Sequence, residues 1–212
     1  PSSAAKVFQP NLVLINADDM RLDDLAFMPY VSSTLANQGT VFTDFFAPTS
    51  LCGPSRASTL TGLFAERTGI YENLAPLGGS ANLDSVTETY GSAPTDYATD
   101  VLGQKVAAFV NASQTTSPNS PFFAYVAPFA PHFPYTPGPQ DVGAYSDIPA
   151  SRPPNFNIPE AGGYPIDDPA YIESIDEGRQ RALESLLAID RMVVNLRADL
   201  QARGILDNTV FV

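Results

Sequence analysis

Short, uninterrupted apolar runs alternate along the chain with longer segments in which apolar residues recur at helical spacing. Three such runs are rich in branched and aromatic side chains, which is typical of buried strands. They cover residues 11–16, 122–127 and 209–212. Leucine, methionine and valine recur every three or four residues over 177–203, which predicts a long helix that ends at Gly204. Shorter helices are expected over 28–38 and 97–111.

Strands that alternate with helices predict an α/β fold with a mainly parallel central sheet flanked by helices on both faces. Residues 134–169 are dense in proline, glycine and asparagine, so we expect a long ordered surface loop there. Functional groups of such sheets gather beyond the carboxyl ends of the strands. Asp18 and Asp19 follow the first predicted strand, and His132 follows the second. The topology is therefore expected to bring these three side chains to one edge.

Composition excludes several classes of protein. With 212 residues, 44% of them hydrophobic, the chain is long enough for one globular domain or most of one. The net charge of −12 argues against nucleic acid as a partner, because nucleic-acid binding depends on neutralising phosphates. No run of about 18 apolar residues is present, so no membrane span is expected. Residues 1–6 lack the apolar core of a signal peptide, which suggests a processed, soluble chain.

The most informative segment begins at Cys52, the single cysteine of the chain. Pro54 is predicted to be the first residue of a short helix and Gly62 its end, which places Cys52 at the helix N-terminus. Backbone N–H groups there favour an anion, and Arg56 adds donors that suit sulfate or phosphate. From the residues alone, simpler alternatives remain open. Cys52 could be a buried apolar side chain, and Arg56 could pair with a surface acid. Asp18 and Asp19 could be solvated turn residues.

The order of several motifs resembles the type I sulfatases, a branch of the alkaline phosphatase superfamily. The strongest is Cys-Gly-Pro-Ser-Arg over 52–56, followed by Leu-Thr-Gly over 60–62. Supporting segments are 10–19, 130–134 and 207–212. The loop around 155–159 and the helix after it resemble the N-acetylglucosamine-6-sulfatase group.

The resemblance implies a chemistry for Cys52. In this family the motif cysteine is oxidised by a formylglycine-generating enzyme to formylglycine, whose aldehyde hydrates to a diol. One diol oxygen attacks sulfur, and collapse of the other expels sulfate without a second difficult hydrolysis. The resemblance also implies that Asp18, Asp19 and the modified Cys52 bind Ca²⁺, with Mg²⁺ as an alternative, because oxygen ligands suit hard cations. Arg56 would hold the diol, and His132 the sulfate ester.

The chain departs from the family pattern at two places, namely an internal basic segment and the end at Val212, which comes just before the family's Asp-Asn metal ligands. The family has a Gly-Lys segment with a nearby histidine, but the lysines of this chain are Lys6 and Lys105 and its single histidine is His132. We therefore expect residues 1–212 to be an N-terminal sulfatase catalytic domain that lacks an internal segment near 85–86 and the C-terminal portion. We expect no sulfatase activity from these residues alone.

The sequence predicts a sulfuric ester hydrolase that acts on a sulfated sugar or an aryl sulfate, a small molecule or a glycan. Two alternatives stay open, namely a phosphonate or phosphodiester hydrolase of the same superfamily and a non-catalytic structural protein that retains the framework. Residues 111–113, Asn-Ala-Ser, form a glycosylation sequon. Together with the resemblance, the sequon predicts a glycoprotein that is secreted or lysosomal.

Overall fold

A computed structural model of the protein describes residues 9–74, 89–118, 120–158 and 165–212. The chain divides into two compact units, one formed by 1–39 together with 91–212 and the other by 40–90. The predicted gap near Ser85 and Val86 lies outside the described residues, as do the N-terminal residues 1–6 and a short part of the predicted loop 134–169.

The larger unit contains a parallel sheet of three strands in the order β2-β1-β3. Val13 of β1 pairs with Ala124 of β2 on one side and with Phe211 of β3 on the other. The bounds are β1 Asn11–Ile15, β2 Phe123–Val126 and β3 Thr209–Phe211. All three predicted strands and their parallel arrangement are thereby confirmed.

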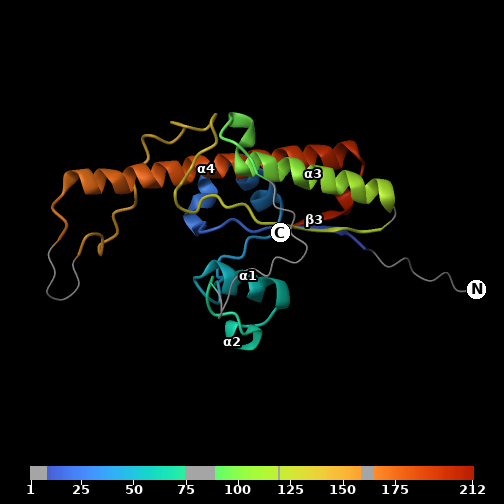
Figure 1. The fold of residues 1–212 in the computed structure, drawn as a ribbon, viewed down its shortest axis with the longest axis horizontal. Helices are drawn as coiled ribbons and strands as arrows, with labels where there is room; N and C mark the ends of the chain where they lie inside the picture. The colour runs from blue at the N-terminus through green and yellow to red at the C-terminus, as the bar shows by residue number, and fades with distance from the viewer. Residues whose placement is uncertain (1–8, 75–88, 119, 159–164) are drawn as a thin grey trace, which may run out of the picture. The chain divides into compact units, whose positions relative to one another are not determined.

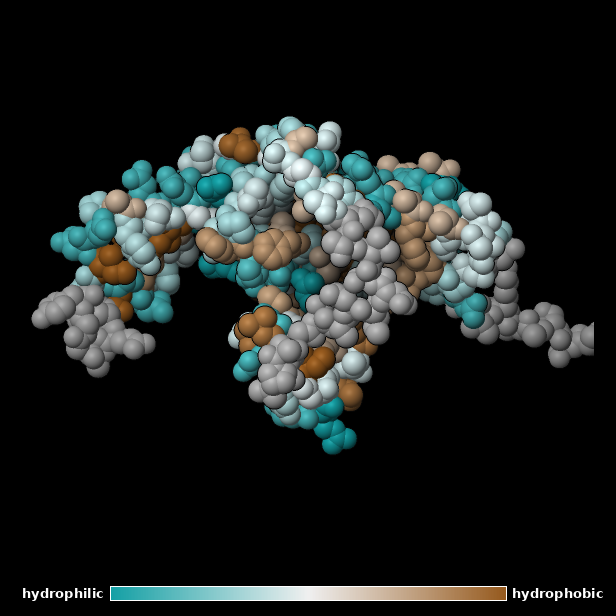
Figure 2. Space-filling view, in the orientation of Figure 1, coloured by the Kyte–Doolittle hydropathy of each residue, from teal (hydrophilic) through white to brown (hydrophobic). Residues whose placement is uncertain are grey.

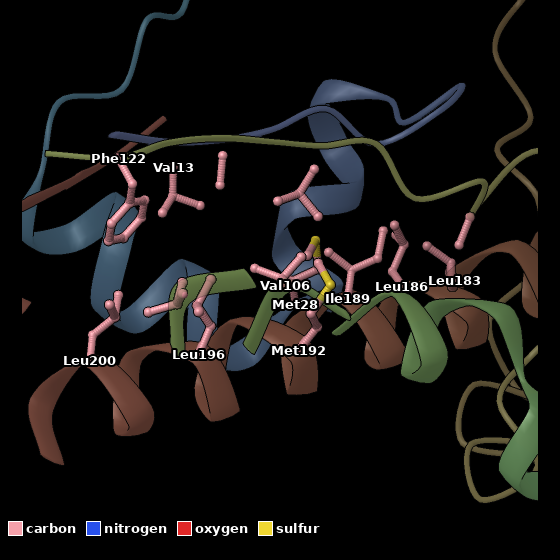
Figure 3. Packing of buried hydrophobic residues seen from close by; sticks show 14 residues of the cluster. Val13, Met28, Val106, Phe122, Leu183, Leu186, Ile189, Met192, Leu196 and Leu200 are labelled. Carbon is pink, nitrogen blue, oxygen red and sulfur yellow. The ribbon is translucent and has the colours of Figure 1, made fainter. Parts of the chain in front are cut away.

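Two helices of this unit, α3 (Ala98–Thr116) and α4 (Pro169–Ala202), lie side by side (Figure 1). A Cβ atom on Gly103 of α3 would lie 3.1 Å from Cγ of Met192 on α4, so glycine permits this close approach. Apolar side chains of α4 point toward the sheet (Figure 3) and form one buried core with it. Its buried members include Val13, Val106, Val110, Phe122, Val126, Leu183, Leu186, Ile189, Met192, Leu196 and Leu200.

Helices α3 and α4 both extend beyond the predicted bounds, α3 at its C-terminal end and α4 at its N-terminal end. Helix α4 begins at Pro169, where the Asp168 side chain accepts hydrogen bonds from the backbone N–H groups of Ala170 and Tyr171. Its first two turns are largely exposed, and even their apolar residues Ile172 and Ile175 are only partly buried, because the buried face of the helix begins at Leu183. The expected helix over 28–38 is present and includes a π-helical turn. The shorter helical elements are η1 Leu22–Phe27, η2 Val31–Ala36, η3 Pro94–Asp96 and η4 Leu206–Asn208.

The two faces of the sheet differ in exposure. Val13, Ala124 and Val126 are buried in the core that α3 and α4 complete. Phe123 and Val210 point to the opposite face and are 52% and 44% exposed. The predicted parallel sheet flanked by helices is confirmed. In the described part of this unit, α3 and α4 cover the face that carries Val13, Ala124 and Val126.

The smaller unit contains α1 (Cys52–Thr61) and α2 (Ala65–Thr68). Pro54 and Ser58 are the buried residues in the part of this unit that the structure describes. Many of its apolar side chains are exposed, and brown and tan patches mark them around α1 and α2 in Figure 2. They include Phe42, Phe45, Phe46, Leu60, Leu63 and Phe64. The described part of this unit therefore has no apolar core of its own.

Among the described residues, no helix is both long enough and apolar enough to cross a membrane.

Candidate functional site

The acidic pair Asp18 and Asp19 follows β1 at its carboxyl end. The backbone of Asn16 extends the sheet by donating to the Val126 carbonyl at 2.8 Å. Two residues later, the Asp18 N–H donates to the carbonyl of Ala130 at 3.2 Å, in the loop that follows β2. The structure thus brings the segments after β1 and β2 together at one edge of the sheet.

The two acidic side chains differ in their surroundings. Asp18 is only 9% exposed, whereas the side chain of Asp19 is 56% exposed. Asp19 has a φ of 64°, in the left-handed region that aspartate adopts more readily than most residues. The turn therefore holds two adjacent carboxylates at different depths, and carboxylate oxygens are the ligands that hard divalent cations prefer.

His132 is oriented by its own loop. A carbonyl oxygen can only accept, so the 2.6 Å contact between His132 Nδ1 and the Phe133 carbonyl places a proton on Nδ1. The other ring nitrogen, Nε2, lies 3.6 Å from Oδ2 of Asp19. A ring nitrogen of His132 also lies within 4.8 Å of a carboxylate oxygen of Asp18. Nε2 is therefore the atom that His132 presents to the acidic pair.

Backbone hydrogen bonds fix the loop that carries His132. The His132 N–H donates to the Phe129 carbonyl at 3.0 Å, and the Tyr135 N–H donates to the His132 carbonyl at 3.1 Å. Both X-Pro bonds that flank His132, at Pro131 and Pro134, are cis. The ring of Phe129 lies 4.5 Å from the His132 ring, measured between centroids, and supports its orientation.

In the smaller unit, Cys52 is the first residue of α1. Gly62 ends this helix in the left-handed region with a φ of 68°, as predicted. The prediction that Pro54 is the first helical residue is wrong, because the helix begins two residues earlier. Proline is still accommodated, since the first-turn N–H that it lacks has no partner within the helix. Arg56 follows Cys52 by four residues, so both lie on one face of α1.

Asn73 is a residue of this segment that sequence reasoning missed. Its Oδ1 accepts a hydrogen bond of 2.7 Å from the Gly53 N–H, next to Cys52. A Cβ atom at Gly53 would lie 2.9 Å from Asn73 Oδ1 and 3.3 Å from the Glu72 carbonyl oxygen. Glycine is therefore required for this contact, which links two positions that are twenty residues apart.

The larger unit also contains a cavity of about 430 Å³ next to His132. Residues 91–99 form one wall and residues 129–139 form the other, and Ser185 of α4 also lines the cavity. The Tyr97 hydroxyl donates to the Thr136 carbonyl at 2.9 Å and joins the two walls. Burial raises the pKa of Tyr97, so its hydroxyl stays protonated at neutral pH and serves as a donor.

Comparison with known proteins identifies relatives. A family model described as Sulfatase matches residues 10–86 and 75–212. Bovine arylsulfatase A (Bos taurus) is 43% identical over 103 residues, which cover 45% of this chain and 20% of the relative. N-acetylglucosamine-6-sulfatase of the goat (Capra hircus) is 24% identical over 286 aligned positions, which cover 98% of this chain and 50% of the relative. The chain thus spans about half the length of the longer-matching curated relative.

Solved structures share the fold. A putative sulfatase of Bacteroides fragilis superposes with a TM-score of 0.73 at 18% sequence identity. The superposition covers 99% of this chain and 62% of the other chain. A second structure, solved in complex with its substrate D-glucosamine-2-N,6-O-disulfate, superposes with a TM-score of 0.70 at 20% identity. This second match covers 96% of this chain and 64% of the other.

Proposed function

Because the chain belongs to the sulfatase family, we propose that it supplies the nucleophile and the acidic metal ligands of a sulfuric ester hydrolase. The substrate we propose is a sulfated sugar or an aryl sulfate, of the kinds that the names of its relatives state. The observation that carries the proposal is the position of Cys52. It is the first residue of α1 and begins the family's Cys-x-Pro-Ser-Arg motif.

We assign the nucleophile to Cys52 after its oxidation to formylglycine by a formylglycine-generating enzyme. One oxygen of the hydrated aldehyde attacks sulfur and displaces the alcohol of the ester, and the second oxygen then re-forms the carbonyl, which breaks the C–O bond to sulfate and regenerates the aldehyde. The N-terminus of α1 favours negative charge at this position, and Arg56 one turn later offers donors to the diol and the anion. Asn73 holds the first turn in place through the Gly53 N–H.

Asp18 and Asp19 fit a hard divalent cation, Ca²⁺ or Mg²⁺, because both offer carboxylate oxygens at the edge of the sheet. Asp18 is fixed by its backbone bond to Ala130, so one ligand is held in place before a cation binds. An oxygen at the modified Cys52 is the third ligand that we propose. When bound, such a cation polarises the sulfate oxygens and stabilises the negative charge that develops on them.

His132 contacts the sulfate ester or its leaving oxygen in this proposal. The Phe133 carbonyl occupies Nδ1, so Nε2 is the atom available for that contact. Because the backbone bonds of the loop fix the ring, little side-chain ordering is needed when substrate arrives.

We further propose a secretory route, with the protein secreted or lysosomal and glycosylated at Asn111. This residue lies on α3 near its C-terminal end, and its side chain is exposed. Its Oδ1 accepts a 3.0 Å hydrogen bond from Arg203, a contact that a glycan on the amide nitrogen leaves intact.

The domain assignment also remains our proposal, namely a catalytic domain that lacks an internal segment near 85–86. Two observations support it. The family model matches the chain in two stretches that overlap at 75–86. The alignment with the goat enzyme runs over 286 positions, more than the 212 residues of this chain, so the relative has residues without a counterpart here.

The experiment compares sulfate release from 4-nitrophenyl sulfate with hydrolysis of bis(4-nitrophenyl) phosphate. It uses the natural protein that carries these residues, produced with a formylglycine-generating enzyme and supplied with Ca²⁺. We expect preference for the sulfate ester and a loss of at least about a thousandfold in Cys52→Ala. Arg56→Ala should also lower the rate, whereas the matched change Arg67→Ala on α2 should not. Preference for the diester would favour the phosphodiesterase alternative, and turnover that persists in Cys52→Ala would contradict the nucleophile assignment.

A further inference from the structure

We propose that the cavity beside His132 receives the alcohol part of the sulfate ester and selects leaving groups without a second negative charge. This inference rests on the proposed function, since it names the substrate class of the same site. It is carried by the lining of the cavity, the charges on it and the contact that joins its walls.

The position of the cavity relates it to His132. The cavity lies within the larger unit, and His132 and Phe129 both contribute to its lining. A volume of about 430 Å³ falls within the range of roughly 300–1,000 Å³ that is usual for small-molecule sites. An ester whose sulfate contacts Nε2 of His132 therefore has room beside it for a ring-sized substituent.

Apolar groups dominate the lining. Phe129 is 53% exposed, and its ring lies against His132, where it offers a flat face to a sugar ring or an aryl ring. Four prolines that line the cavity add further rigid C–H surface, and they are Pro94, Pro134, Pro137 and Pro139. Such a lining suits the carbon skeleton of a leaving alcohol better than the sulfate group itself.

Charge decides which alcohols fit. Among the described residues that line the cavity there is no lysine or arginine, and the charged carboxylate is that of Asp96. Asp96 Oδ2 accepts a 3.3 Å hydrogen bond from the Ala93 N–H, which keeps the carboxylate at the cavity wall. Asp100 and Asp141 nearby are different, because Arg191 forms salt bridges with both of them. A carboxylate or second sulfate on the leaving group would therefore face Asp96 without a compensating cation from the lining.

Tyr97 is a positioning residue for this cavity. Its hydroxyl bond to the Thr136 carbonyl fixes the separation of the two walls. Because the bond is neutral, its loss should weaken the binding of neutral and anionic rings to a similar extent. Asp96, by contrast, should affect only the discrimination between them.

The test is a binding experiment that needs no turnover. The ¹⁵N-labelled chain is titrated with methyl glucoside, which is neutral, and with methyl glucuronoside, which has the same ring and one carboxylate. Amide shifts of Ala98 and Thr99 report on the cavity. We expect the neutral glycoside to bind about tenfold more tightly at low salt, since like charges at the wall repel. Asp96→Asn should bring the two affinities to within about twofold, and Asp167→Asn, an exposed acid outside the lining, should leave the ratio unchanged.

Several outcomes would overturn the inference. The cavity is not a subsite if the neutral glycoside shifts neither amide at concentrations of tens of millimolar. Equal or tighter binding of the glucuronoside, or a ratio that Asp96→Asn does not change, would show that Asp96 does not select. Tyr97→Phe should lower both affinities with the ratio kept, and a changed ratio would contradict its positioning role. These results do not depend on sulfate release, so they are separate from failure of the proposed function.

Discussion

Replacing Asp190 with alanine removes a buried carboxylate that joins α4 to the helical segment around η2. Asp190 is 6% exposed, and its two oxygens accept hydrogen bonds from the backbone N–H groups of Val31 at 2.7 Å and Tyr30 at 3.1 Å. Both amides are in the first turn of their helical segment and have no partner within the helix. The carboxylate therefore caps that helix from a position about 160 residues away.

The cost of Asp190→Ala follows from these contacts. A hydrogen bond to a charged group contributes roughly 1.5–3 kcal/mol, and two are lost here. Water can hydrate the freed amides in part, since Tyr30 and Val31 are only partly buried. We therefore expect a loss of about 3 kcal/mol in the free energy of unfolding. For a chain of this size, that corresponds to a fall of roughly 10 °C in the thermal midpoint.

The assay is thermal and urea unfolding followed by circular dichroism. Asp199→Ala is the matched control, because it removes the same charge from α4 but affects a partly exposed pair with Arg203, whose side chains are 29% and 28% exposed for Arg203 and Asp199. This control should cost less than about 1 kcal/mol. Asp190→Asn should lie between the two, since one side-chain oxygen still accepts. Equal stability of Asp190→Ala and Asp199→Ala would show that the buried contacts add nothing.

Three further predictions concern the candidate site. Gly53→Ala should displace the Asn73 side chain, because the added Cβ would lie 2.9 Å from Asn73 Oδ1, and sulfatase activity should fall by about tenfold or more. Activity equal to that of the unchanged protein would contradict this prediction. Asp18→Asn should weaken Ca²⁺ binding in calorimetry by at least about tenfold, whereas Asp23→Asn should not, and equal effects would exclude Asp18 as a ligand. Phe129→Ala should raise KM for 4-nitrophenyl sulfate more than it lowers kcat, and an unchanged KM would show that the ring does not contact the substrate.

The strands and the core face of α4 could be predicted from sequence because burial leaves a pattern in composition. The run that became β1 is apolar at successive positions, and Leu183, Leu186 and Met192 recur at helical spacing. The start of α4 at Pro169 was not predicted in this way, since its first turns are largely exposed and begin at the Asp168 cap, well before the buried face that starts at Leu183.

The candidate site could be predicted only in part. Topology was enough to place Asp18, Asp19 and His132 at one edge of the sheet, because parallel strands end there together. Two contacts had no local signal, namely the Gly53–Asn73 hydrogen bond and the bond that joins Tyr97 to the Thr136 carbonyl. Both join segments that are far apart in sequence, and neither depends on a periodic pattern.

Mass spectrometry of the peptide that contains Cys52 tests the proposed nucleophile most directly. The protein is produced with a formylglycine-generating enzyme, digested and treated with an aldehyde-reactive hydroxylamine, and Cys52→Ala serves as the unreactive control. We predict that position 52 carries the aldehyde or its hydrate and that the peptide forms the hydroxylamine adduct. A peptide with only free thiol, from a preparation that releases sulfate from 4-nitrophenyl sulfate, would contradict this assignment.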